Sequence, residues 1–262
     1  MTELLLHEDR RPLLIGHRGL PALAPENTLR SFELALDHGA DSFEVDVVAL
    51  ADGTLVAGHS LDLAQLCHGA MRGPVAQRTL TDLRRLDPEL ATFEEVLELA
   101  STRLEGLPFL IDIKSAGSEQ ALVDAVRRYG LESQALFCSL ERSVLVRLRE
   151  LAPEIARSLS YPADRHRVSG RRAFAPIVPI ALKGLRALLS HRLGAWLDET
   201  GAAAVTLHHD VISRALVQAC HVRRVAVLAW TVDDVMVQQR LFRAEIDAII
   251  TNDSRLFSLL IR

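Results

Sequence analysis

The sequence predicts a single (β/α)₈ barrel of the TIM type, and three observations favour this fold class. Short apolar runs alternate with longer amphipathic segments, and a repeated strand-then-helix order implies a parallel sheet. Eight such units can be counted when the turn at residues 51–53 and the short extension after it are assigned to the second unit. Eight units in 262 residues is a common size for this barrel. A doubly wound open sheet is the alternative architecture.

Each predicted strand is a short apolar run bounded by turn residues or by a change of hydrophobic period. In chain order the strands are expected over residues 13–16, 43–48, 109–113, 135–138, 155–160, 203–207, 225–229 and 248–250. The sequence Asp52-Gly53 is a turn signal, and residues 54–57 are expected to extend the second strand unit.

The predicted helices show apolar residues at helical spacing and recognisable end signals. They are expected over residues 27–38, 92–100, 118–129, 142–151, 182–197, 213–221, 235–242 and 254–260. Asn27 is expected to cap the first helix, and Thr92 with Glu95 has the spacing of a capping box. Gly130 and Pro153 follow predicted helix ends.

The pattern predicts one domain over residues 1–262, because no linker or low-complexity segment divides it. Residues 60–90 and 162–181 are the longest stretches without the pattern. They are expected to be loops or small insertions at the barrel mouth. The first of them is the expected cap insertion.

The composition narrows the possible functions and the expected setting. Apolar residues make up 49% of the chain, charged residues 24%, and the net charge is −4 without a block of Lys or Arg, which argues against a nucleic-acid surface. Cys67, Cys138 and Cys220 are far apart and form no CxxC motif, so neither a disulfide scaffold nor a zinc site is predicted. No signal peptide or membrane-spanning run is visible, and we expect a reducing, cytoplasmic setting without an integral membrane segment.

Polar residues occur where the predicted strands end, which is the end that forms active sites in such barrels. They are His17, Arg18, Glu44, Asp46, His59, Asp112, Lys114 and Trp230. Glu44 and Asp46 are two residues apart on one strand, as are Asp112 and Lys114 on the next, so each pair shares one face.

These residue types together favour chemistry on a phosphate ester. Three carboxylates that face one another need a cation, and carboxylate oxygens suit Mg²⁺ or Ca²⁺. Arg18 and Lys114 then remain as positive groups suited to a phosphate. His17 and His59 could carry protons near neutral pH. The residues alone therefore predict a metal-assisted reaction on a small phosphate ester, with two histidines as acid and base.

Each pair also has a purely structural interpretation. The His-Arg pair could lie in a surface loop, and the second-strand carboxylates could lie on an exposed edge or in salt bridges. Asp112 could pair with Lys114 across their two-residue step. The coincidence of all these residues at strand ends favours a common site. His208 and His209 follow the sixth strand and could face the same site.

Seven segments of the chain resemble the glycerophosphodiester phosphodiesterase family in order and spacing. They are GHRG (16–19), PENT (25–28), GADSFEVDV (39–47), DGTLVAGH (52–59), IDIK (111–114), AWTVDD (229–234) and IDAIITND (246–253). The resemblance implies a (β/α)₈ barrel that hydrolyses glycerophosphodiesters to glycerol 3-phosphate and an alcohol with Mg²⁺ or Ca²⁺. It also implies attack by the substrate's own glycerol hydroxyl, which would give a cyclic phosphate.

The resemblance also implies a role for each matching residue. It makes His17 and His59 catalytic, Arg18, Lys114 and Trp230 substrate-binding, Glu44, Asp46 and Asp112 metal-binding, and Glu26 and Asn27 supporting residues of the PENT loop. At Asp112 the family usually has glutamate, which is one methylene longer. Ser60 follows the second histidine where the family has aspartate, and residues 59–74 lack the family's pattern. Asp233 and Asn252 replace the more usual Asn and Asp.

Two alternative functions are compatible with these departures. One is hydrolysis of a lysophospholipid, for which the apolar, mildly basic segment 173–197 could provide a lipid-facing surface. The other is a barrel that binds a phosphodiester without hydrolysing it, as Ser60 and Asp112 suggest.

Overall fold

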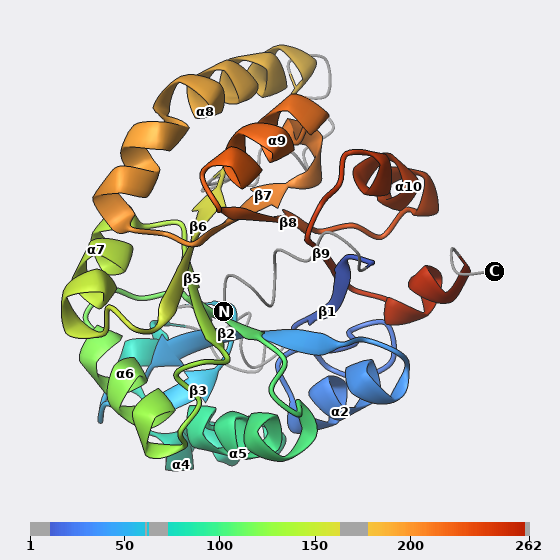
Figure 1. The fold of residues 1–262 in the computed structure, drawn as a ribbon. Coiled ribbons are helices and arrows are strands. Elements are labelled where there is room, and N and C mark those ends of the chain that lie inside the picture. The colour runs from blue at the N-terminus through green and yellow to red at the C-terminus, as the bar shows by residue number, and fades with distance from the viewer. Residues whose placement is uncertain (1–10, 61, 63–72, 163–177, 260–262) are drawn as a thin grey trace.

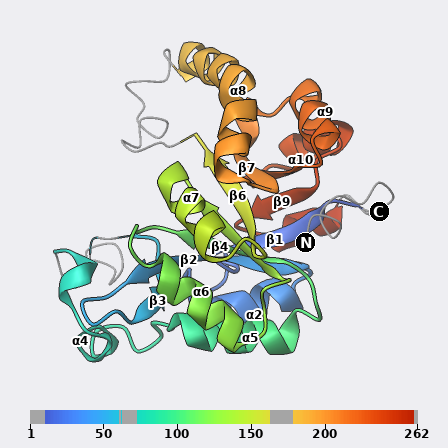
Figure 2. The same cartoon turned by 60° about the vertical axis from the view of Figure 1, so that its left-hand side comes forward.

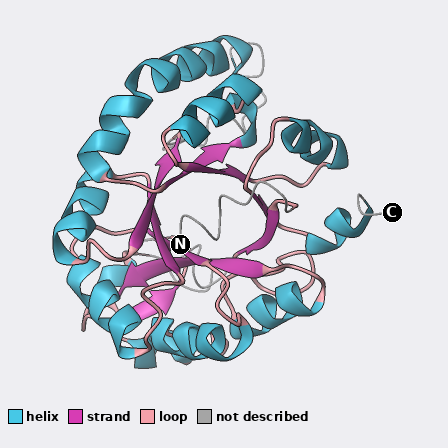
Figure 3. Ribbon diagram, viewed as in Figure 1, coloured by secondary structure: helices cyan, strands magenta, loops and turns pink. Residues whose placement is uncertain are grey.

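Eight parallel strands close into a barrel with helices outside it (Figures 1 and 3). The computed structural model describes residues 11–60, 62, 73–162 and 178–259. In these ranges the barrel strands are β1 (Leu13–His17), β2 (Ser42–Ala49), β4 (Phe109–Ile113), β5 (Ala135–Ser139), β6 (Ala156–Tyr161), β7 (Ala204–His208), β8 (Ala226–Trp230) and β9 (Ala248–Thr251). Because β1 pairs with both β9 and β2, the ring is complete. The predicted barrel is confirmed, and the open-sheet alternative is wrong.

The helices of the described residues surround this ring (Figure 3). They are α2 (Leu29–Asp37), α4 (Leu80–Arg84), α5 (Phe93–Arg103), α6 (Glu119–Arg128), α7 (Arg142–Leu151), α8 (Val178–Thr200), α9 (Arg214–Val222) and α10 (Val235–Arg243), with short 3₁₀ turns η1 (Val75–Gln77), η3 (His209–Val211) and η4 (Ser254–Leu259). The predicted capping box at Thr92 and Glu95 is present. The last predicted helix is the 3₁₀ segment η4.

The two-residue period of the strands divides the apolar side chains between two cores. Ile15, Leu110 and Leu136 belong to a small cluster inside the barrel, whereas Phe43 and Phe109 belong to the large layer between strands and helices. The rings of Phe43 and Phe109 are 6.0 Å apart. Since Phe43, Val45 and Val47 all pack outward, the carboxylates between them on β2 face the barrel interior.

The first helix starts two residues later than the sequence predicted. Thr28, in extended conformation, is the N-cap of α2, and its hydroxyl accepts a hydrogen bond from the Ser31 amide. The prediction that Asn27 caps the helix is therefore wrong. Asn27 has a left-handed φ of 59°, and its side chain turns instead toward Asp46. Thr28 caps the helix in place of Asn27, because the Asn27 side-chain amide is hydrogen-bonded to Asp46.

The described part of residues 60–90 packs beside the end of β2. β3 (Leu55–Ala57) pairs antiparallel with β2, and Val75, Leu83 and Leu90 bury against Val48 and Val56. α4 and β3 lie together at one side of the barrel in Figure 2. Residues 61 and 63–72 are outside the described ranges, so the expected cap stays a prediction, as does the single-domain boundary.

The segment considered as a lipid-facing surface, residues 173–197, overlaps α8. Residues 163–177 lie outside the described ranges, and with them most of the second stretch without pattern. Within α8, Leu189, Leu193 and Leu197 are buried in the large core, which accounts for the apolar character of that part.

Among the described residues no helix combines the length and apolarity needed to cross a membrane. Cys138 and Cys220 are buried thiols, and Cys67 is outside the described ranges.

Arg157 on β6 joins the helix ends at the opposite side of the barrel from the strand C-termini. It is 7% exposed and donates to four backbone carbonyl groups, those of Ala152, Ile155, Thr200 and Gly201. Carbonyls at helix C-termini lack partners within the helix, so one buried guanidinium satisfies several of them. Burial, with Arg149 acting in the same direction, lowers the pKa of this guanidinium.

We expect Arg157→Met to destabilise the fold by roughly 2–4 kcal/mol, because it leaves buried carbonyl oxygens without donors. Urea unfolding measures the change. Arg127→Met is the matched control, since Arg127 is 40% exposed in its ion pair with Glu154 and should matter by less than about 1 kcal/mol. Equal stability of the Arg157 variant and the parent would contradict this account.

Candidate active site

The Gly16–Gly19 turn carries His17 and Arg18 from the end of β1 to the barrel mouth. A Cβ atom added to Gly16 would lie 2.5 Å from the Gly19 carbonyl oxygen. One added to Gly19 would lie 2.4 Å from the backbone of Ser31, and Gly19 has a φ of +87°. Both glycines are therefore required by the close approach of the turn to α2, which fixes the position of the two functional candidates between them.

The loop before α2 is fastened to the second strand through Asn27. Its side-chain amide donates to Asp46 Oδ2 at 3.0 Å, and its carbonyl oxygen accepts from the Asp46 backbone amide at 3.2 Å. The Asn27 backbone amide donates to the Arg18 carbonyl at 3.0 Å. Glu26 in the same loop accepts from Arg18 Nη1 at 2.9 Å. The PENT loop thus contacts both the arginine and the buried carboxylate of the site.

Three carboxylates predicted as metal ligands come together inside the mouth. Glu44, Asp46 and Asp112 each offer an oxygen within 4.8 Å of the others. Glu44 and Asp46 are buried, and the side chain of Asp112 is 19% exposed. The shorter Asp112 therefore still reaches the group.

Two cationic side chains lie against this group. Arg18 Nε is 2.8 Å and Lys114 Nζ 2.7 Å from opposite oxygens of Asp46. Lys114 also contacts Asp112, as the structural interpretation of that pair anticipated. The Glu44 carboxylate accepts from the Arg18 backbone amide at 2.9 Å. The five groups form one network centred on Asp46.

The pKa values show how unevenly this network distributes its charge. Burial acts to raise the pKa of Asp46, but Lys114 and Arg18 hold it well below the usual range. Burial and the neighbouring Asp46 raise the pKa of Glu44 well above the usual range. Burial also raises the pKa of Asp112. Although burial acts to lower it, Asp112 and Asp46 raise the pKa of Lys114, which stays charged.

The donor set fits a hard divalent cation. Three carboxylates face two cationic side chains, so the network carries one net negative charge when all are ionised. Burial and the neighbouring Asp46 charge both oppose ionisation of Glu44, and a cation held beside it would favour the ionised form. All three candidate ligand groups offer oxygen, which Mg²⁺ and Ca²⁺ prefer.

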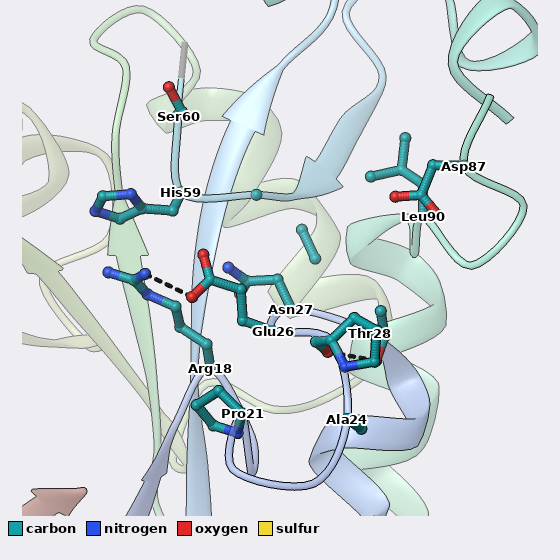
Figure 4. A pocket seen from close by; sticks show the side chains of 13 residues that line it. Arg18, Pro21, Ala24, Glu26, Asn27, Thr28, His59, Ser60, Asp87 and Leu90 are labelled. Carbon is teal, nitrogen blue, oxygen red and sulfur yellow. Dashed lines mark hydrogen bonds and ion pairs between the residues drawn. The ribbon is translucent and has the colours of Figure 1, made fainter. Parts of the chain in front are cut away.

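The two histidines lie on different elements of the mouth. His17 ends β1, and its Nδ1 is 2.8 Å from Asn252 Oδ1 after β9. His59 follows β3, and Figure 4 shows its ring beside the Arg18 guanidinium. Burial lowers the pKa of both imidazoles to about 4, and Arg18 acts in the same direction on each. Both rings are therefore neutral at pH 7 without a bound anion.

A cavity of about 500 Å³ opens beside this network (Figure 4). Its wall includes Arg18, His59 and Ser60 on one side and the PENT loop on the other. Asp87 and Leu90 also line the cavity. They were not predicted as site residues, because they belong to the stretch 60–90, which shows no strand or helix pattern. A small phosphate ester would fit this volume and meet the arginine.

The remaining candidates lie elsewhere on the rim. Trp230 ends β8, donates from Nε1 to the Thr206 carbonyl at 3.1 Å and meets the His208 ring edge-on. His208 stacks on His209 with ring centroids 4.4 Å apart, and His209 Nδ1 is 3.2 Å from Asp210. These residues form a cluster of their own at the ends of β7 and β8.

Known proteins of one family match most of this chain. A profile of the Glycerophosphoryl diester phosphodiesterase family matches residues 17–256. A glycerophosphodiester phosphodiesterase of Caldanaerobacter subterraneus subsp. tengcongensis is 28% identical, with 96% of this chain and 98% of that protein covered. A probable glycerophosphodiester phosphodiesterase 1 of Mycobacterium tuberculosis is 30% identical, with 66% of this chain and 74% of that protein covered.

Solved structures share the fold. A putative glycerophosphoryl diester phosphodiesterase from Silicibacter pomeroyi superposes with a TM-score of 0.79 at 23% identity, with 99% of this chain and 96% of that chain covered. An Oleispira antarctica phosphodiesterase, crystallised with the product sn-glycerol-3-phosphate, superposes with a TM-score of 0.75 at 24% identity. The match covers 96% of this chain and 97% of that one.

We expect Mg²⁺ or Ca²⁺ to raise the melting temperature of the chelator-treated protein. A cation at a hundred times its dissociation constant stabilises the folded state by about 2.7 kcal/mol. For a chain of this size that corresponds to roughly 5–10 °C. Thermal unfolding with each metal chloride and with added chelator measures the effect.

The response should disappear in Glu44→Gln, which keeps the shape of the side chain and removes a ligand charge. Glu33→Gln, an exposed substitution on α2, is the control and should keep the full response. A shift of the same size in both variants would show that the cation binds elsewhere.

Proposed function

The chain belongs to the glycerophosphoryl diester phosphodiesterase family, and on that premise we propose that it hydrolyses glycerophosphodiesters to glycerol 3-phosphate and an alcohol. The observation that carries the proposal is the network at the mouth, in which Arg18 and Lys114 converge on Asp46 beside two neutral histidines. The product bound to the Oleispira antarctica relative is the one expected here.

Arg18 and Lys114 are proposed to bind the phosphate. Arg18 lines the cavity and offers a planar guanidinium, which suits two phosphate oxygens at once. Lys114, 18% exposed, adds a point charge from β4. Both cations stabilise the negative charge that develops on the phosphate oxygens during displacement. Trp230 is proposed to contact the substrate from the far side of the rim.

Glu44, Asp46 and Asp112 are proposed to hold one divalent cation, Mg²⁺ or Ca²⁺. When bound, such an ion supplies Lewis acidity toward a phosphate oxygen. The protein's own contribution is the fixed position of the carboxylates, which Asn27 and Lys114 secure through their contacts with Asp46. Glu26 and Asn27 are supporting residues in this proposal.

His17 and His59 are proposed to move the protons. One imidazole accepts the proton of the attacking oxygen as that oxygen bonds to phosphorus, and the other gives a proton to the alcohol oxygen as its bond to phosphorus breaks. If the attacking oxygen is that of a water, glycerol 3-phosphate forms directly. If it is the glycerol hydroxyl, a cyclic phosphate forms, and a water then opens it to glycerol 3-phosphate with the two histidines in exchanged roles. An anionic phosphodiester between the rings would raise their low pKa values toward neutrality, so that the ring acting as the acid takes up a proton from solvent before it gives one to the alcohol oxygen.

We expect His17→Ala and His59→Ala each to reduce kcat on glycerophosphocholine by roughly 10²–10⁴, the usual contribution of a general acid or base. Release of glycerol 3-phosphate measures it. His191→Ala, an exposed histidine on α8, should keep the parent rate. Parent activity in either mouth variant would remove that histidine from the mechanism.

A substrate panel tests the proposed reaction itself. Glycerophosphodiesters with different alcohols and a lysophospholipid are assayed with Mg²⁺, with Ca²⁺ and with chelator. We expect glycerol 3-phosphate from the glycerophosphodiesters and loss of turnover with chelator. Turnover of the lysophospholipid alone would favour the lipid alternative. Binding of a glycerophosphodiester without turnover under any of these conditions would favour the non-hydrolysing alternative.

A further inference from the structure

His17 is held by a short chain of hydrogen bonds that none of the proposed roles uses. Its Nδ1 lies 2.8 Å from Asn252 Oδ1, at the end of β9. Asn252 Nδ2 donates to Asp233 Oδ2 at 2.6 Å, and the Asn252 backbone amide donates to Asp233 Oδ1 at 2.8 Å. The Thr251 hydroxyl donates to the same Asp233 oxygen at 2.9 Å. Asp233 thus accepts three hydrogen bonds from Thr251, the last residue of β9, and from Asn252, which follows it.

The chemistry of these groups determines which way the amide faces. An ionised carboxylate only accepts hydrogen bonds, so the side of Asn252 that faces Asp233 must be its NH₂ group. The amide oxygen is then left to face His17. Because that oxygen also only accepts, His17 Nδ1 must carry a hydrogen. In the neutral ring the free lone pair is therefore on Nε2.

We propose that Asp233 and Asn252 are positioning residues for the phosphodiesterase reaction, which hold His17 as the Nδ1–H tautomer and leave Nε2 to exchange protons with the substrate. The inference rests on the proposed catalytic role of His17. Neither residue needs to touch the substrate, since both act through the imidazole. An imidazole fixed in orientation and tautomer enters the reaction without rearranging.

The isosteric variant Asp233→Asn tests the chain of hydrogen bonds. An amide at position 233 can donate as well as accept, so it no longer forces the NH₂ group of Asn252 to face it. The Asn252 amide can then turn its NH₂ group toward His17, which favours the other tautomer. We expect kcat to fall roughly tenfold, because Asp233 is exposed and its replacement leaves a share of the molecules with the original tautomer, while KM changes less than twofold.

Asp234→Asn is the matched control, because it makes the same change at the next residue. Asp234 is the N-cap of α10 and accepts from the amides of Met236 and Val237. Asparagine caps helices equally well, so this variant should keep both kcat and the melting temperature.

The double variant Asp233→Asn with Asn252→Asp is expected to restore activity. The new carboxylate at position 252 would accept from His17 Nδ1 and from the new amide at position 233. The oxygen of that amide would still accept from the backbone amide of residue 252 and from Thr251. Recovery of at least half of the parent kcat would show that the hydrogen-bond pattern matters rather than either residue alone. A double variant as slow as Asp233→Asn would overturn the proposal.

Nitrogen-15 NMR of histidine-labelled protein gives a readout that does not depend on activity. The His17 signals, identified by their loss in His17→Ala, should show a protonated Nδ1 and an unprotonated Nε2 at neutral pH. Asp233→Asn should shift them toward a mixture of tautomers, and the double variant should return them. Unchanged signals and unchanged kcat in Asp233→Asn would overturn the positioning role.

The two proposals fail in different ways. If the parent protein releases no glycerol 3-phosphate from any diester, the proposed function is wrong whatever the NMR signals show. If the parent is active and Asp233→Asn is equally active, the proposed function stands and the positioning role is wrong.

Discussion

The buried charge of Asp46 is the constraint on which the site depends. Its side chain is inaccessible to solvent, and an unpaired carboxylate there would be strongly unfavourable. Arg18 and Lys114 compensate it from two different strand ends, and Asn27 adds an amide donor from the loop between them. The ion pairs and the hydrogen bond that compensate the Asp46 charge therefore join the ends of β1, β2 and β4 to the PENT loop. These are the elements that carry nearly all of the proposed chemistry.

Strand periodicity explains how the barrel can bury such charge without losing its core. Along β2 the apolar Phe43, Val45 and Val47 pack against the helices, which leaves the intervening positions for the interior. The interior is apolar around Ile15 and Leu110, whereas the three carboxylates lie at the mouth. At the opposite end, a buried arginine binds backbone carbonyls rather than carboxylates. The buried arginine and the carboxylates of the candidate site thus lie at opposite ends of the barrel.

The sequence was sufficient for the parts of the structure that depend on local pattern. The barrel, its strand ends and the convergence of Glu44, Asp46 and Asp112 follow from two-residue and helical periods, and the structure brings these carboxylates together. Local pattern was misleading at Asn27, a good cap by type whose amide is taken by Asp46. The contact between His17 and Asn252 joins residues 235 positions apart, and only closure of β1 against β9 brings them together.

The partner of His17 also bears on the proposed role of its ring in proton transfer so near to several charges. A carboxylate in direct contact with the imidazole would raise its pKa, whereas the Asn252 amide places a neutral group between the ring and Asp233. Burial, with Arg18 acting in the same direction, lowers the pKa of His17 to about 4. The Asp233 carboxylate is thus proposed to orient the ring through the amide, without a direct contact that would stabilise the imidazolium form. In this proposal the ring is oriented by a charged residue while the group in contact with it is neutral.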